Sequence, residues 1–136
     1  MIQVIAGKKG SGKTKRILDM ANNSVKDSRH DIIFIDDDNR YMFDLRHEVR
    51  FVNASEYGVA GADQFIGFLC GILAANFDVG QIYIDAFLKL VNCDLTEMES
   101  FFARLDVLSH RHNMDFVLSV SADIDTLPEF VKQYLL

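Results

Sequence analysis

The sequence is most informative at Gly7-Lys8-Lys9-Gly10-Ser11-Gly12-Lys13-Thr14. This stretch satisfies the complete pattern G-x-x-x-x-G-K-[ST]. An apolar run at residues 2–6 precedes it, and residues 13–24 after it carry apolar side chains at helical spacing. Glycines let successive backbone N–H groups surround phosphate oxygens, and the start of a helix adds partial positive charge. The pattern therefore predicts a phosphate-binding loop between a strand and a helix.

The residue types in this loop predict a nucleotide site with a magnesium ion. Lys13 is expected to reach the β- and γ-phosphates, and the Thr14 hydroxyl is expected to coordinate Mg²⁺. The alternative is an ordinary glycine-rich turn, but chance seldom supplies the full motif between a strand and a helix. The residues expected to bind the nucleotide are Gly7, Lys8, Lys9, Gly10, Ser11, Gly12, Lys13 and Thr14.

Apolar runs and helical patterns alternate along the rest of the chain. Strands are expected at residues 32–35, 49–52, 81–84 and 116–120, the second of them short and at an edge. Helices are expected at about residues 58–77 and 96–113, and residues 127–136 fit either a helix or a strand. This alternation is typical of a mainly parallel sheet with helices on both faces. The prediction is an α/β three-layer sandwich, and 136 residues fit a single domain, 1–136.

A second acidic element follows the strand at residues 81–84. Asp85 comes directly after these apolar residues, where a parallel sheet delivers its carboxylate to the edge that carries the loop. Magnesium keeps several waters and needs few protein ligands, so one carboxylate at this place suits it. We therefore expect Asp85 and Thr14 to hold Mg²⁺. The alternative is an aspartate that only caps a turn.

The loop and the strand end at Asp85 together resemble the P-loop NTPase superfamily, in which they are the Walker A and Walker B elements. The resemblance extends over most of the chain as a strand–helix pattern. It implies the P-loop NTPase fold and binding of a nucleoside triphosphate with Mg²⁺, but no particular reaction. The Asn-Lys-x-Asp tetrapeptide that gives GTPases their specificity is absent, so ATP is the expected nucleotide.

The catalytic acid is less clear from the sequence. Many ATPases of this superfamily place a glutamate directly after the Walker B aspartate, but Ala86 stands there. Asp36, Asp37 and Asp38 follow the second expected strand, and RecA-like ATPases carry their catalytic acid near that place. By this resemblance Asp36 or Asp37 would orient the attacking water, and the alternative is a solvated acidic turn. With Lys13, these three aspartates are the candidate catalytic residues.

Three functions remain open at this point. Short RecA-like or motor-type ATPases share the loop, which implies a weak Mg²⁺-dependent ATPase. Type II thymidine kinases also have a segment similar to Asp38-Asn39-Arg40-Tyr41, but here Asp85-Ala86-Phe87 lacks their glutamate, and no four-cysteine zinc module is present. A non-hydrolysing nucleotide-dependent switch is the third possibility. Isolated P-loop cores commonly need a partner that supplies an arginine, so a homo-oligomer or a larger ATPase assembly is the expected partner.

Several single residues carry smaller predictions. Ser119 and Ser121 are candidate sensors of the γ-phosphate, or simply small packing residues. Arg104 and Arg111 are the best-placed candidates for an arginine finger, but surface solvation is the favoured interpretation of each, and His110 and His112 are expected to be exposed. The remaining local predictions are a Thr96–Glu99 capping box, buried free thiols at Cys70 and Cys93, and glycines that pack on the chain's own sheet at Gly67 and Gly71.

Composition limits the possible partners. Fourteen Lys and Arg against twenty Asp and Glu give a net charge of −6, so no global positive field favours nucleic acid. The longest strongly apolar stretch, residues 65–75, has about half of the ~20 residues that a membrane span needs. No basic segment precedes the first strand, so no secretory signal is visible and a cytoplasmic protein is expected.

Overall fold

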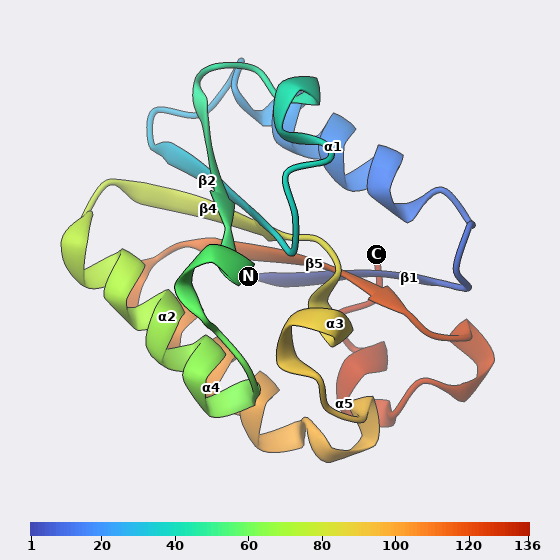
Figure 1. The fold of residues 1–136 in the computed structure, drawn as a ribbon. Coiled ribbons are helices and arrows are strands. Elements are labelled where there is room, and N and C mark those ends of the chain that lie inside the picture. Colours follow the sequence, from blue (N-terminus) through green and yellow to red (C-terminus); the bar gives the residue numbers. More distant parts are fainter.

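Figure 1 shows the computed structural model, which describes residues 1–136. Its five strands are β1 (Ile2–Gly7), β2 (Asp31–Asp36), β3 (Val49–Asn53), β4 (Val79–Ile84) and β5 (Asp115–Ser121). They form one sheet in the order β1-β5-β4-β2-β3, and every neighbouring pair is parallel. The predicted α/β class is confirmed, and the sheet, expected to be mainly parallel, is parallel throughout. The strand at residues 49–52 lies at an edge, as expected.

Helices cover both faces of the sheet unequally. They are α1 (Lys13–Ser24), α2 (Ala62–Ala75), α3 (Phe87–Val91), α4 (Glu99–His112) and α5 (Glu129–Lys132). In Figure 1, α1 lies on one face, and the other four helices lie on the opposite face. Because the carboxyl ends of all five strands meet at one edge, the segments that follow β1, β2, β4 and β5 are brought together there.

Aromatic side chains build much of both cores. On the α1 face, Phe34 stacks between Phe51 and Tyr83, with ring centroids 6.4 Å away on each side. On the other face, Phe87 packs against Phe101 and other rings, and its own side chain is fully buried. Each fully buried side chain of this size contributes about 1.5–3 kcal/mol to folding. The abundance of phenylalanine in the sequence is therefore explained by packing.

The chain's last residues join the edge strand. After α5, the Val4 N–H donates to the Tyr134 carbonyl at 2.8 Å, and the Leu136 N–H donates to the Val4 carbonyl at 2.9 Å. The tail, for which the sequence leaves helix and strand open, thus contains both a short helix and one strand-like bridge. No helix in the structure combines the length and the apolar composition that crossing a membrane requires.

The predicted capping box at Thr96 and Glu99 is wrong. The Asp94 carboxylate accepts hydrogen bonds from the backbone N–H and the hydroxyl of Thr96, both at 3.0 Å. This arrangement starts a short 3₁₀ turn, Leu95–Glu97, and α4 begins only at Glu99. Aspartate replaces threonine as the capping residue because its carboxylate satisfies two donors at once.

The predicted packing of the two glycines on α2 and the predicted burial of the two thiols are also wrong. Gly67 and Gly71 are exposed, and a Cβ atom at either would meet no other atom within 4 Å, so they do not pack on the sheet. Cys70, on the same outward side, is exposed, and Cys93 is only half-buried, although both thiols are free. The inward positions of α2 are taken by larger side chains such as Phe65 and Leu69, which leaves the small residues facing outward.

Candidate functional site

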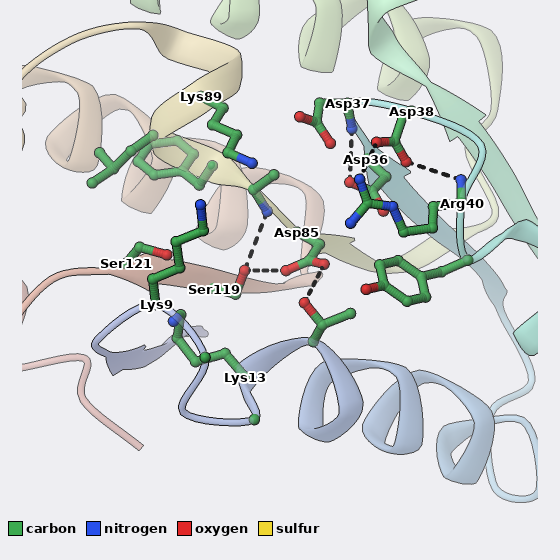
Figure 2. Close-up of a pocket in the computed structure, with 17 residues that line it drawn as sticks. Lys9, Lys13, Asp36, Asp37, Asp38, Arg40, Asp85, Lys89, Ser119 and Ser121 are labelled. Carbon is green, nitrogen blue, oxygen red and sulfur yellow. Dashed lines mark hydrogen bonds and ion pairs between the residues drawn. The ribbon is translucent and has the colours of Figure 1, made fainter.

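A cavity of about 490 Å³ lies at the carboxyl edge of the sheet. Its walls come from the loop after β1, from the ends of β2, β4 and β5, and from α3 (Figure 2). Five loop residues line it, namely Lys9, Gly10, Gly12, Lys13 and Thr14. Four predicted carboxylates line it as well, namely Asp36, Asp37, Asp38 and Asp85. The structure therefore brings most of the predicted site residues together.

The loop holds its shape with its own backbone. Gly10 and Gly12 have φ angles of 84° and 89°, in the left-handed region that favours glycine. The Lys13 ammonium donates to the Lys8 carbonyl at 3.0 Å, across the loop. Burial lowers the pKa of Lys13, while the nearby Asp85 carboxylate acts in the opposite direction. The lysine is thus already directed over the loop.

Three of the predicted loop residues lie outside the cavity wall. Gly7 is buried at the end of β1, where a Cβ atom would come within 2.5 Å of the Ser11 hydroxyl oxygen. The Lys8 side chain forms an ion pair with Asp123 at 3.6 Å. Gly7 and Ser11 therefore shape the turn, and the side chain of Lys8 is engaged elsewhere.

Asp36, Asp85 and Ser119 form a row across β2, β4 and β5. The sheet register pairs Ile84 with the residues that directly precede Asp36 and Ser119 in their strands. Asp36, Asp85 and Ser119 each come one residue later, so they lie level with one another across the three strands. Because side chains alternate along a strand, the three side chains point to the same face of the sheet, the one that carries α1. The parallel register alone delivers two carboxylates and a hydroxyl to the first turn of α1.

Asp85 is buried and hydrogen-bonded on both oxygens. Its Oδ2 accepts from the Thr14 hydroxyl at 3.0 Å, and its Oδ1 accepts from the Ser119 hydroxyl (Figure 2). The two residues expected to hold Mg²⁺ are thus in direct contact. Oxygen donors from a hydroxyl and a carboxylate are the ligands that Mg²⁺ takes, so these residues fit that ion.

Asp36 occupies an unusual environment for a carboxyl group. Its residue is 2% exposed, its Oδ1 accepts from the Asp37 backbone N–H at 2.8 Å, and its Oδ2 has no partner. Burial, followed by the interaction with the Asp37 side chain and the nearby Asp85 carboxylate, raises the pKa of Asp36 to about 8, although the hydrogen bond from the Asp37 backbone N–H acts in the opposite direction. Asp36 is therefore mostly protonated at neutral pH.

Asp37 and Asp38 are half-buried in the cavity wall beside Asp36, with one carboxylate oxygen from each of the three within 4.8 Å of the others. Asp38 is engaged by Arg40: their ion pair measures 3.6 Å, and the Arg40 backbone N–H donates to Asp38 at 2.9 Å. The Arg40 guanidinium also lies 5.8 Å from the centre of the Tyr41 ring. Asp37 forms no ion pair.

Surface solvation, the favoured interpretation of the two arginines on α4, is confirmed. Arg104 and Arg111 are exposed on α4, outside the cavity, and Arg104 is paired with Asp63 at 3.4 Å. His110 and His112 are exposed, as expected. Both candidate sensors, Ser119 and Ser121, line the cavity.

Two cations in the cavity wall were missed by the sequence reasoning, Arg40 and Lys89. Arg40 had a signal, since it belongs to the segment Asp38–Tyr41 that resembles thymidine kinases. No sequence pattern points to Lys89, because its position depends on the backbone turn that follows β4. That turn passes through Ala86, whose φ of 55° is rare for a residue with a Cβ atom.

Comparisons with known proteins support the fold. No protein-family model matches the sequence, and no curated protein matches it. Among solved structures, the flagellar accessory protein FlaH from Methanocaldococcus jannaschii is similar, with a TM-score of 0.57 and 14% sequence identity. The match covers 97% of this chain and 65% of that protein, so the chain spans just under two-thirds of its length. The all-parallel sheet with its flanking helices matches a RecA-like P-loop fold.

Proposed function

We propose that this chain binds Mg·ATP at the loop Gly7–Thr14 and hydrolyses it slowly. The observation that carries the proposal is the meeting of Lys13, Thr14 and Asp85 in one cavity, with a hydrogen bond between the last two. The backbone N–H groups of the loop and the first turn of α1 supply donors for phosphate oxygens. ATP rather than GTP is proposed because the sequence lacks the tetrapeptide that selects guanine.

Thr14 and Asp85 are the proposed magnesium ligands, Asp85 acting through the ion's water shell. When bound, the ion would neutralise charge on the β- and γ-phosphates. Ser119 holds Asp85 from the side opposite Thr14, which fixes the direction of the carboxylate. A ligating carboxylate that is itself hydrogen-bonded is better oriented than a free one.

Asp37 is the proposed residue that orients the attacking water. Of the three adjacent aspartates, Asp36 is mostly protonated near pH 7 and Asp38 is engaged by Arg40, which leaves Asp37 without an ion pair. The water oxygen forms a bond to the γ-phosphorus as the bond to the bridging oxygen breaks. The water's proton passes to the carboxylate, and ADP and inorganic phosphate leave.

The rate is expected to be low. Ala86 stands where related ATPases carry a glutamate, and it has no group that accepts a proton.

Calorimetry with Mg·ATP tests the binding step. Lys13→Ala should lower the affinity about ten- to a hundredfold, because it removes a charge-assisted contact worth roughly 1.5–3 kcal/mol. Lys26→Ala is a matched control, since Lys26 is exposed just after α1 and lines neither this cavity nor its neighbour. Equal affinity of wild type and Lys13→Ala would contradict the loop assignment.

Phosphate release at saturating Mg·ATP tests the reaction. Asp37→Asn should lose most of the turnover while it still binds ATP, and Asp38→Asn should lose less. If all three Asp→Asn variants at positions 36–38 match wild type, the base lies elsewhere. If the wild type itself binds ATP without turnover, a nucleotide-dependent switch replaces the enzyme.

A nucleoside-kinase-like phosphotransferase is the second candidate. One observation favours it: a second cavity of about 340 Å³ shares Thr14 and Tyr41 with the first and is lined by Asp19, Asn22 and Asp44. Such polar groups beside an aromatic ring suit a nucleoside acceptor. Adding nucleosides to the ATP assay separates the two, since a kinase would form a nucleoside monophosphate instead of inorganic phosphate.

A further inference from the structure

The turn after β4 has an unusual backbone. Ala86 lies in the left-handed region, which residues with a Cβ atom seldom adopt. Its N–H donates to the Ser119 hydroxyl at 3.3 Å, so the turn is attached to the same serine that holds Asp85. Unusual conformations of this kind persist where the surroundings determine them, and they gather at functional sites.

The helix that follows is firmly anchored, although it has only five residues. Phe87, Leu90 and Val91 of α3 are buried, and the Phe87 ring contacts three other phenylalanine rings. The alternation of buried and outward positions in this single turn places Leu88 and Lys89 on the side of the cavity. The backbone of Lys89 is therefore held in place, and only its side chain is free to adjust.

The Lys89 ammonium has no acidic partner. The side chain is exposed and forms no ion pair, unlike Arg40, whose guanidinium is held by Asp38. Figure 2 shows the amines of Lys89 and Lys9 directed into the cavity on the side away from the aspartates. An unpaired cation over a cavity that also holds the phosphate-binding loop is placed to meet negative charge.

We propose that Lys89 contacts the γ-phosphoryl group during its transfer and stabilises the charge that develops there. This inference rests on the proposed function. Phosphoryl transfer is accelerated mainly by positioned positive charge, which other P-loop proteins often obtain from an arginine of a partner. Here α3 supplies the cation from within the same chain, directly after the Walker B strand. Lys89 takes no part in bond formation.

The test compares ground-state and transition-state ligands of the same site. Lys89→Ala should bind Mg²⁺ with a non-hydrolysable ATP analogue within about threefold of wild type, because the ground state gains little from this cation. It should bind Mg·ADP with aluminium fluoride, a planar mimic of the transferred group, about a hundredfold more weakly. Turnover should fall by a similar factor, and Lys89→Arg should restore part of both.

Lys26→Ala is the matched control, since Lys26 is an exposed lysine just after α1 and does not line the cavity. Unchanged thermal melting of each variant shows that folding is intact. Equal affinity of wild type and Lys89→Ala for the aluminium fluoride complex would overturn the role of Lys89 and leave the proposed function standing. Failure of the wild type to bind the ATP analogue would overturn both.

Discussion

The two sides of the cavity are built in different ways. The loop side, Gly7–Thr14, is formed by adjacent residues and is held by glycine conformations and one lysine–carbonyl hydrogen bond. The acidic side, Asp36–Asp38 with Asp85, is formed by strands far apart in the sequence and includes a carboxyl group that is 2% exposed. Exposed side chains on the loop side, such as Lys8, can therefore be changed with little effect on the fold. The acidic side contains buried carboxyl groups, so substitutions there are expected to change stability as well as the proposed ligand contacts.

The largest expected effect concerns Asp36 and the pH dependence of stability. Because its pKa is raised to about 8 in the folded protein, the native state binds this proton more tightly than the unfolded chain. Its contribution to stability is then fully present below about pH 4 and is lost as the pH rises through about 8. The Asp36→Asn variant lacks this titrating group and does not lose this stability. The difference in free energy of unfolding between the variant and wild type should therefore shift in favour of the variant by a few kcal/mol between pH 4 and 8. Each tenfold change in proton affinity is worth about 1.4 kcal/mol.

Urea unfolding of both proteins in EDTA, at steps of one pH unit, measures this difference. Asp27→Asn is the control, because Asp27 is exposed. A constant difference between wild type and Asp36→Asn across this range would mean that Asp36 is ionised in the folded protein. The acidic side would then contribute no more to the pH dependence of stability than the loop side does.

The next effect concerns Asp85 and tests whether the acidic side of the cavity binds a metal ion. Asp85→Asn should weaken ATP binding at least tenfold in Mg²⁺, because a neutral amide attracts the hydrated ion much less than a carboxylate does. In EDTA the loss should be much smaller. Titrations in the two conditions provide the measurement, and an identical loss in both would indicate structural damage instead of a metal role.

A smaller effect is expected at Ala86. Glycine adopts positive φ without the penalty that a Cβ atom brings, so Ala86→Gly should raise the free energy of unfolding by about 1 kcal/mol. Thermal melting measures the change. A decrease in stability would mean that the turn is not strained, and the anchoring of α3 would need another explanation.

The smallest effect is expected at Lys8, on the loop side. Its side chain pairs with Asp123 at the surface, and exposed ion pairs are worth only about 0–1 kcal/mol. Lys8→Ala should therefore leave both ATP affinity and stability almost unchanged, since its carbonyl still accepts from Lys13. A tenfold loss of affinity would show that the lysine turns toward the ligand, and that the loop side depends on more than its backbone and Lys13.

The loop and the fold class were predictable because their signals are local. Glycine spacing, an apolar strand and a following helix all lie within about twenty residues, and alternating elements predict a parallel sheet. The approach of Asp36 to Asp85 was also predictable, since parallel strands end at one edge. The place of β5 between β1 and β4 was not, because no local pattern records which strands become neighbours.

Errors in the prediction arose where competing groups decide the outcome. At Thr96, a neighbouring aspartate took over the capping role that the sequence spacing suggested for threonine. At Cys70, burial depended on which face of an almost wholly apolar helix turned inward. Lys89 could not be placed at all, since its direction follows from the positive φ of Ala86 and from the packing of Phe87.

A continuous series of hydrogen bonds joins the first turn of α1 to the start of α3. It runs from the Thr14 hydroxyl to Asp85, from Asp85 to the Ser119 hydroxyl, and from there to the N–H of Ala86. A ligand that engages Thr14 alters the first bond of this series, and the position of α3 depends on the last. A partner that binds α3 and shifts it would therefore change the affinity of the ligand at Thr14. Because such coupling is reciprocal, the ligand at Thr14 would change the affinity of that partner by the same factor.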